Sequence, residues 1–263
     1  MRARARNLGL IAFSFAAGCV QASYNLAAER QDYSFTSVQR EVSIGRKVAH
    51  KVEEEIPPVQ DQPLQERVDS IGQRLVAVCD RKELPYTFRV IQDDTLNAFS
   101  LPGGYVFLYK GLVDKTANDD ELAAVIGHEI GHIAARHAIH RYESQMGAQI
   151  LQLAAVATRQ GPAAAGVGIA AQATQLAYAR DEELEADRLA VKYLKAAGFD
   201  ATAVLSFLRK MEEIHKDESH YMPRGVVRPN YAFTHPGIPE RILAAKEALY
   251  GVADYIDYLN TPP

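Results

Sequence analysis

Cysteine is scarce in this chain of 263 residues, which contains only Cys19 and Cys79. So low a content excludes a fold that is held together by a framework of disulfides. Cys79 ends an amphipathic helical series that runs from Leu64 to Val78. This position favours a buried, unreactive thiol over a nucleophile.

An excess of positive charge is also absent, since 29 lysines and arginines face 33 aspartates and glutamates and the pI is near 6.1. Nucleic-acid-binding domains carry a basic patch or stripe, so we expect no nucleic-acid partner. No internal repeat is visible, and the roughly 240 residues after residue 22 are enough to bury one core. We therefore expect residues 23–263 to form a single domain.

Long apolar runs are missing as well. The stretch from Met146 to Tyr178 is rich in alanine and glycine, but its least polar part, Gly161 to Ala171, is shorter than the about 20 apolar residues that cross a bilayer. We expect a packed helical hairpin here. The alternative is a mobile plug or membrane-facing surface that controls entry to a cleft, because the glycines of this stretch would permit motion.

The N-terminal segment has the layout of a secretory signal. Arginines at positions 2, 4 and 6 precede an apolar stretch from Leu8 to Ala17, and this order is typical of export. We expect residues 1–22 to form a signal peptide and the mature protein to be exported.

Two cleavage sites are compatible with this signal. Ala16-Ala17-Gly18-Cys19 resembles a bacterial lipobox, although Ala16 stands where leucine is typical, and it predicts cleavage before Cys19 and lipidation of that residue. Val20-Gln21-Ala22 also fits cleavage after Ala22, which would release a soluble protein. By resemblance to lipoprotein sorting, Val20 implies a periplasmic protein anchored to the outer membrane of a Gram-negative cell.

The most informative motif is His128-Glu129-Ile130-Gly131-His132, which matches the pattern HExxH. Residues four apart lie on the same helical face, so both imidazoles can reach one metal ion while Glu129 reaches its bound water. The motif therefore indicates a zinc peptidase with His128 and His132 as ligands and Glu129 as general base. The competing interpretation is a pair of structural histidines, which Glu129 between them disfavours.

The surrounding sequence places this motif on a buried helix. Asn118, followed three residues later by Glu121, has the form of a helix start with a capping box. Apolar residues then recur at three-to-four-residue spacing, at Leu122, Val125, Ile126, Ile130 and Ile133. We expect a helix that begins at Asn118 and turns one face toward the core.

A catalytic zinc site needs a third protein ligand, and Glu183 is the best candidate. It lies in a strongly helical stretch from Ala179 to Ala190, and Gly198 ends that helix. Asp187 shares the face of Glu183, so it can accept the remaining ring N–H of a ligand histidine. Acidic runs on helices are usually solvated faces; the HExxH motif favours a metal site here.

Four motifs in order resemble one family. Besides HExxH and Glu183-Leu184-Glu185-Ala186-Asp187, the chain contains the stretch from Asn97 to Gly104, and Thr234-His235-Pro236 followed by Arg241. This set resembles the gluzincin zinc metallopeptidases that include the CAAX prenyl protease and the heat-shock membrane protease. The similarity covers most of the mature chain and is greatest to the bacterial periplasmic lipoprotein and quality-control branch.

The resemblance implies roles for individual residues. It implies one zinc ion per chain with three ligands, His128, His132 and Glu183. His235 would approach the metal or the oxyanion, and Arg241 would support the site. The stretch from Asp217 to Phe233 indicates a loop able to return over the cleft and to place His235. In some relatives the corresponding histidine fills the fourth zinc position and silences the enzyme, so an autoinhibited state is an alternative here.

The same comparison excludes metzincins, which continue the motif to a glycine and a third histidine where this chain has Ala135 and Ala138. We expect the remaining histidines to be structural: His50, His137, His140, His215 and His220.

The segment from Tyr86 to Tyr109 predicts a β-hairpin, because two runs with β character flank a turn rich in glycine. An edge strand beside the cleft could bind an extended peptide through its main chain, with Asn97, Ala98 and Phe99 at the substrate rim. The alternative is an ordinary core sheet in which Asn97 is simply a turn residue.

These features predict an exported zinc-dependent metalloendopeptidase that hydrolyses unfolded or misassembled envelope proteins. Zinc would lower the pKa of its bound water toward ~7, and Glu129 would take the proton of that water and pass it to the leaving amine. The alternative is a chaperone-like or latent binding protein on the same zinc scaffold.

The expected fold class is α+β, a mainly helical zincin-type metalloprotease domain with a small β-sheet and an HExxH active-site helix. Two N-terminal helices, Ser37 to Glu55 and Gln62 to Cys79, would precede the hairpin, and a C-terminal helix would follow Pro239.

Overall fold

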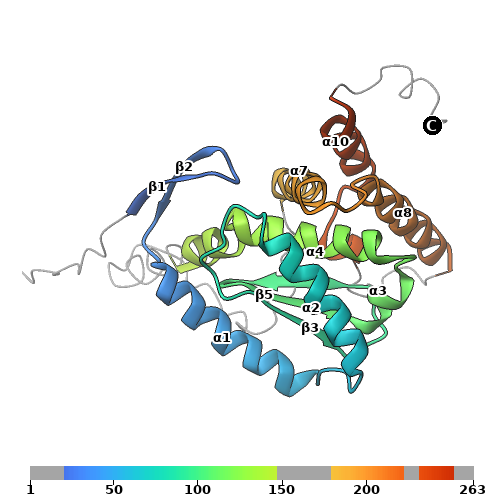
Figure 1. The fold of residues 1–263 in the computed structure, drawn as a ribbon, viewed down its shortest axis with the longest axis horizontal. Coiled ribbons are helices and arrows are strands. Elements are labelled where there is room, and N and C mark those ends of the chain that lie inside the picture. Colours follow the sequence, from blue (N-terminus) through green and yellow to red (C-terminus); the bar gives the residue numbers. More distant parts are fainter. Residues whose placement is uncertain (1–20, 147–178, 222–230, 252–263) are drawn as a thin grey trace, which may run out of the picture.

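The computed structural model describes residues 21–146, 179–221 and 231–251. These residues are mainly helical with two small sheets, so the α+β class is confirmed. Helix α4, Asp119–Ala134, crosses the middle of the molecule. The three-stranded sheet and the N-terminal helices lie on one side of it and the C-terminal helices on the other (Figure 1).

The first two predicted helices are present as α1, Val38–Glu55, and α2, Gln62–Val76. Ser37 and Asp61 cap them, since each side chain accepts a hydrogen bond from the backbone N–H three residues on. Helix α2 ends three residues before Cys79, because the chain tightens there into i→i−3 hydrogen bonds. Cys79 is buried as expected, and burial raises the pKa of its thiol.

Helix α4 begins where the sequence predicted. The Asn118 side chain accepts a hydrogen bond from the Glu121 N–H at 2.9 Å. The Glu121 carboxylate accepts from the N–H of Ala117, at 2.7 Å, one residue earlier than in a capping box. Every residue from Glu121 to Ala134 is buried, so the HExxH motif lies on a core helix.

The sheet corrects the predicted hairpin. Its strands β3 (Thr87–Ile91), β4 (Ala98–Leu101) and β5 (Tyr105–Tyr109) lie in the order β3–β5–β4. The hairpin consists of β4 and β5, which pair antiparallel, whereas β3 runs parallel to β5. The β character of a segment does not specify its partner or its direction, so the predicted antiparallel pairing of the segments that form β3 and β5 was wrong. Strand β4 is an edge of this sheet.

Helix α7, Arg180–Ala197, packs along α4 and ends at Gly198, whose φ of 75° is left-handed, as the sequence predicted. The two helices approach closely because Gly131 has no side chain. A Cβ at that position would lie 2.9 Å from the carbonyl oxygen of Ala186. This approach brings the acidic residues of α7 to the histidines of α4.

The C-terminal part differs from the predicted loop. Helix α8, Ala203–Tyr221, extends into the expected 217–233 loop, and residues Tyr231–Thr234 form the short helix α9. Residues 222–230 lie outside the described part of the chain. Helix α10, Ile238–Tyr250, confirms the C-terminal helix and starts one residue before Pro239.

The sequence did not predict the antiparallel hairpin of β1, Gln21–Asn25, and β2, Arg30–Ser34, which lies at one end of the molecule (Figure 1). It also did not predict the short helix α3, Lys110–Lys115, or the helical residues 137–146.

The predicted signal segment lies outside the described residues up to residue 20, and so does the expected helical hairpin from residue 147 to residue 178. Among the residues that the structure describes, no helix is both long and apolar enough to cross a membrane. The domain boundary at residue 22 falls within β1 and stays a prediction.

Candidate active site

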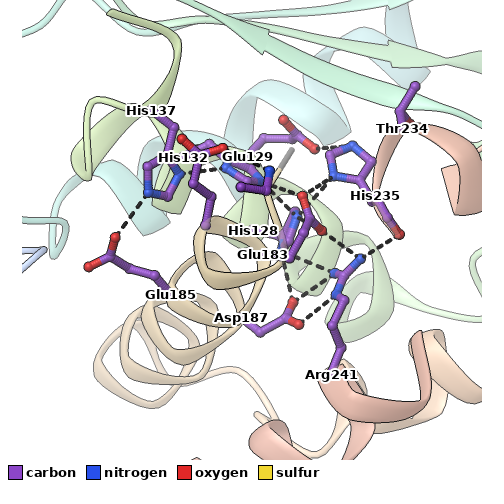
Figure 2. A network of polar contacts seen from close by, with 12 residues as sticks. His128, Glu129, His132, His137, Glu183, Glu185, Asp187, Thr234, His235 and Arg241 are labelled. Carbon is purple, nitrogen blue, oxygen red and sulfur yellow. Dashed lines mark hydrogen bonds and ion pairs between the residues drawn. The ribbon is translucent and has the colours of Figure 1, made fainter. Parts of the chain in front are cut away.

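Four side chains that could hold one metal ion meet at the contact between α4 and α7. They are His128, His132, Glu183 and His235, hereafter the ligand group. Each offers one ligand atom, the four atoms lie within 4.8 Å of one another, and all four residues are buried. Figure 2 shows the two α4 histidines and the α7 glutamate converging with His235, which follows α9.

The geometry of this group fits zinc. The Nε2 atoms of His128 and His132 are 3.0 Å apart, and Glu183 Oε1 lies 3.3 Å from His132 Nε2. Imidazole nitrogens and a carboxylate oxygen are the donors of catalytic zinc sites. Beside them, both carboxylate oxygens of Glu129 are buried without a hydrogen-bond partner. A bare buried carboxylate is costly, and a water held next to a cation would satisfy it.

An ion-pair network positions His128. Its Nδ1 lies 2.8 Å from Asp187 Oδ1, and Arg241 donates to both oxygens of Asp187, at 2.7 and 2.8 Å. The same guanidinium lies 2.8 Å from Glu183 Oε2. Burial would raise the pKa values of these two carboxyls, but Arg241 holds the Asp187 pKa below its usual range, and His235 and Arg241 do the same for Glu183.

The two α4 histidines have opposite pKa shifts. Burial and Arg241 lower the pKa of His128, but Asp187 and Glu183 outweigh them and raise it to about 9. Burial and the neighbouring His128 lower the pKa of His132 well below its usual value. Without a cation, His128 is therefore the protonated member of the pair, and a metal ion has to displace that proton.

His235 is fixed against the edge of the sheet. Its Nε2 donates to the carbonyl of Ala98 at 3.3 Å, which directs Nδ1 toward Glu183 Oε1, 3.0 Å away. Its ring stacks on Tyr231 with centroids 4.5 Å apart. The backbone carbonyl of His235 accepts from Arg241 at 3.2 Å. These contacts place Nδ1 within the ligand group.

Two of the three predicted substrate-rim residues, Asn97 and Ala98, also meet this region, whereas Phe99 packs in a separate hydrophobic cluster around Phe107. The Asn97 side chain accepts from Thr234 Oγ1 at 2.9 Å and from the Ala98 N–H at 2.9 Å. The N–H of Tyr231 donates to the Leu96 carbonyl at 2.7 Å, so α9 is tied to the start of β4. The ring of Phe99 stacks on Phe107 with centroids 5.1 Å apart.

The remaining histidines fall into two groups. His50 and His215 are exposed, and His140 lies 2.8 Å from Asp32, so these three are outside the ligand group; His220 is in helix α8. His137 is different, because its Nδ1 lies 2.8 Å from His132 Nδ1 and its Nε2 lies 3.0 Å from Glu185 Oε2.

Sequence reasoning missed three residues at this centre. It did not single out Glu185 or Tyr231, and it treated His137 as structural. Glu185 lies within the quoted acidic run, but nothing there separates it from its neighbours. His137 lies five residues after His132, a spacing that does not share a helical face.

Comparison with known proteins identifies the family. The model of peptidase family M48 matches residues 62–249. A beta-barrel assembly-enhancing protease of Escherichia coli (strain K12) is 32% identical over 221 residues, which are 80% of this chain and 44% of that protein. A mitochondrial metalloendopeptidase of Schizosaccharomyces pombe is 28% identical over 182 residues, 69% of this chain and 52% of that protein.

The chain thus spans less than half the length of the bacterial relative. The family match nevertheless covers more than half of this chain and includes every residue of the ligand group. The predicted family and enzyme class are confirmed: this chain belongs to peptidase family M48, a family of zinc metallopeptidases.

Proposed function

We propose that this chain is an exported zinc-dependent metalloendopeptidase that hydrolyses unfolded or misassembled envelope polypeptides, with Glu129 as general base. The observation that carries the proposal is the buried ligand group beside a carboxylate that has no hydrogen-bond partner. The name of the bacterial relative, a beta-barrel assembly-enhancing protease, supports an envelope substrate.

Each proposed role follows from position. Zinc held by His128, His132 and Glu183 would supply a Lewis acid that polarises the scissile carbonyl and acidifies water. Glu129, buried and without a hydrogen-bond partner, would take the proton of the attacking water and return it to the leaving amine. His235, whose Nε2 lies 3.5 Å from Glu129 Oε1, would steady the charge on the oxyanion.

The other role of His235 is inhibitory. Because its Nδ1 already lies within the ligand group, it could fill the fourth metal position and exclude the attacking water. The two roles use different ring nitrogens and predict opposite effects of removing the ring. Removal would lower activity in the first case and raise it in the second.

Strand β4 is the proposed binding site for the substrate backbone, because it is an edge strand. The outward backbone groups of Ala98 are already engaged, since its carbonyl accepts from His235 and its N–H donates to the Asn97 side chain. An extended peptide would therefore pair with β4 beyond Ala98 and pass the ligand group, with recognition through main-chain hydrogen bonds. Such recognition suits unfolded polypeptides of varied sequence.

We propose lipidation of Cys19 and attachment to the outer membrane, facing the periplasm. Cleavage before Cys19 would leave β1 whole, whereas cleavage after Ala22 would remove the first two residues of that strand. Fractionation of cells that express wild type and Cys19→Ala tests this, because only the wild type should remain with the membranes. Equal release of both forms would contradict the anchor.

The activity is tested by zinc content and casein cleavage of wild type, Glu129→Gln and His235→Ala, with His215→Ala as the exposed-histidine control. We expect about one zinc per chain in wild type and Glu129→Gln. Cleavage should be lost in Glu129→Gln and kept in the control. Zinc without cleavage in every form, together with binding of unfolded casein, would favour the chaperone-like alternative.

A further inference from the structure

The two histidines of the HExxH motif have different partners at their Nδ1 atoms. His128 Nδ1 lies 2.8 Å from the carboxylate of Asp187, whereas His132 Nδ1 lies 2.8 Å from a second imidazole, that of His137. His137 is itself buried, with 1% of its surface exposed. On its far side, Nε2 lies 3.0 Å from the carboxylate of Glu185 (Figure 2).

An unusual backbone turn directs His137 at His132. Arg136, which follows the end of α4, has a φ of 63°, a left-handed conformation that is unfavourable for a residue with a side chain. Its guanidinium donates to Ser34 Oγ at 3.0 Å and to the Thr36 carbonyl at 3.3 Å. The end of the β1–β2 hairpin thus holds the turn that returns His137 to the last turn of α4.

Proton positions make this contact directional. His132 Nε2 faces the ligand group, so a neutral ring that binds a metal there carries its proton on Nδ1. That N–H can donate to His137 Nδ1, which leaves the His137 proton on Nε2, where it donates to Glu185. A single tautomer of each ring satisfies these contacts of His132 and His137.

The far end of this chain of contacts is also fixed. Arg30 donates to both oxygens of Glu185, at 3.1 and 3.4 Å, and Arg188 lies 3.8 Å from the same carboxylate. For His128, the corresponding carboxylate, Asp187, is held by Arg241. Each histidine of the motif therefore leads outward to a carboxylate that is anchored by arginine.

We propose that His137, held by Glu185, is a positioning residue that fixes the tautomer and ring orientation of the zinc ligand His132. The inference rests on the proposed zinc site. Hydrogen bonds of this kind, one shell away from a metal, typically change metal affinity by about 10- to 100-fold when they are removed.

The test is the zinc dissociation constant, measured by chelator competition on the full chain, and the visible absorption of the cobalt(II) form. His137→Ala should weaken zinc binding about 10- to 100-fold and change the cobalt spectrum. His137→Asn places an amide oxygen near the position of Nδ1, so it should recover most of the affinity. His140→Ala is the matched control, because His140 lies one turn further on and pairs with Asp32 instead.

Wild-type zinc affinity and an unchanged cobalt spectrum in a folded His137→Ala would overturn the proposal. So would equal losses in the alanine and asparagine variants, which would indicate a packing role. Should His137→Ala fail to fold, Glu185→Ala takes its place, because this side chain lies at the surface end of the contacts. It should weaken zinc binding, and unchanged affinity would again contradict the proposal.

These readouts do not depend on peptide cleavage. A wild type that binds zinc but does not cleave casein would contradict the proposed function and leave the orientation of His132 testable. A wild type that cleaves casein, together with a zinc affinity that does not change when His137 is substituted, would contradict only the present inference.

Discussion

Arg241 provides the most direct test of how the buried charges of the site are balanced. Its guanidinium is 1% exposed, lies 2.7 and 2.8 Å from the two oxygens of Asp187, and lies 2.8 Å from Glu183. Replacing it with methionine keeps much of the volume but leaves two buried carboxylates without their cation. We expect Arg241→Met to destabilise the metal-free protein.

The size of the effect follows from burial. Removing one partner of a buried ion pair costs about 3–5 kcal/mol, since the remaining charge stays desolvated and unpaired. For a domain of this size, 1 kcal/mol corresponds to roughly 2–4 °C in melting temperature, so the expected loss is roughly 6–20 °C. Arg67 is the control, because its 2.7 Å pair with Asp119 is exposed on both sides. Arg67→Met should cost about 0–1 kcal/mol.

The assay is thermal unfolding followed by circular dichroism, with a chelator present so that all forms are compared without metal. A melting temperature of Arg241→Met within about 2 °C of wild type would correspond to no more than about 1 kcal/mol. That result would refute the reasoning, because it would mean that Asp187 and Glu183 tolerate burial without their counter-ion. An equal loss in Arg67→Met would also refute it, since burial would then not be the cause.

Three further predictions follow from the same structure. Burial lowers the pKa of His128, but Asp187 raises it to about 9. Zinc affinity should therefore rise about tenfold per pH unit between about pH 6 and 8, because the bound metal displaces this proton. A pH-independent affinity, measured by chelator competition, would contradict this. Burial would raise the pKa of Glu121, but its ion pair with Lys210 lowers that pKa below the unfolded value of 4.5. The stabilisation by this pair is therefore complete above pH 4.5 and is lost as the pH falls through the pKa of the folded state. Urea unfolding at a series of pH values should show this acid dependence reduced in Glu121→Gln. Gly103 has a φ of 80°, and a Cβ there would lie 2.6 Å from a backbone atom of α1. Gly103→Ala should therefore lower the free energy of unfolding by about 1–3 kcal/mol. An unchanged free energy of unfolding would show that the turn can shift freely and would contradict this.

The helices that could be predicted carry their signals locally. Ser37 and Asn118 accept hydrogen bonds at the starts of α1 and α4, and Gly198 adopts the left-handed conformation that ends α7. Each signal depends on side chains within four residues of the boundary. Helix α8 was not predicted, although it packs against both α4 and α10.

Strand pairing is not local in this way. The β character of segments 87–91 and 105–109 was evident, but their parallel pairing depends on the crossing of the chain through residues 92–97. The short run Ala98–Leu101, which pairs antiparallel with β5, was not predicted as a separate strand. The true partner in the hairpin, β4, is an edge strand, and its role as a substrate rim stays a prediction.

The residues of the site likewise divide into those whose placement follows from local sequence and those whose placement depends on distant contacts. His128, Glu129 and His132 come from one helix, so their common face follows from spacing alone. Glu183 and Asp187 share a second helix, and only the close packing at Gly131 brings them to the first. The place of His137 depends on the turn at Arg136, whose guanidinium contacts Ser34 and Thr36 about one hundred residues earlier. Local periodicity contains no signal for such a contact.

The charges of the centre explain why these distant contacts meet at one point. Glu129, Glu183 and Asp187 place three carboxylates in a region where each is at most 1% exposed, and Arg241 supplies one positive charge. A dication in the ligand group would balance the remaining two negative charges. Without a dication, the proton on His128 balances only one of these two negative charges. Burial makes an uncompensated charge costly, so the same carboxylates that orient the ligands also favour a divalent ion over a proton.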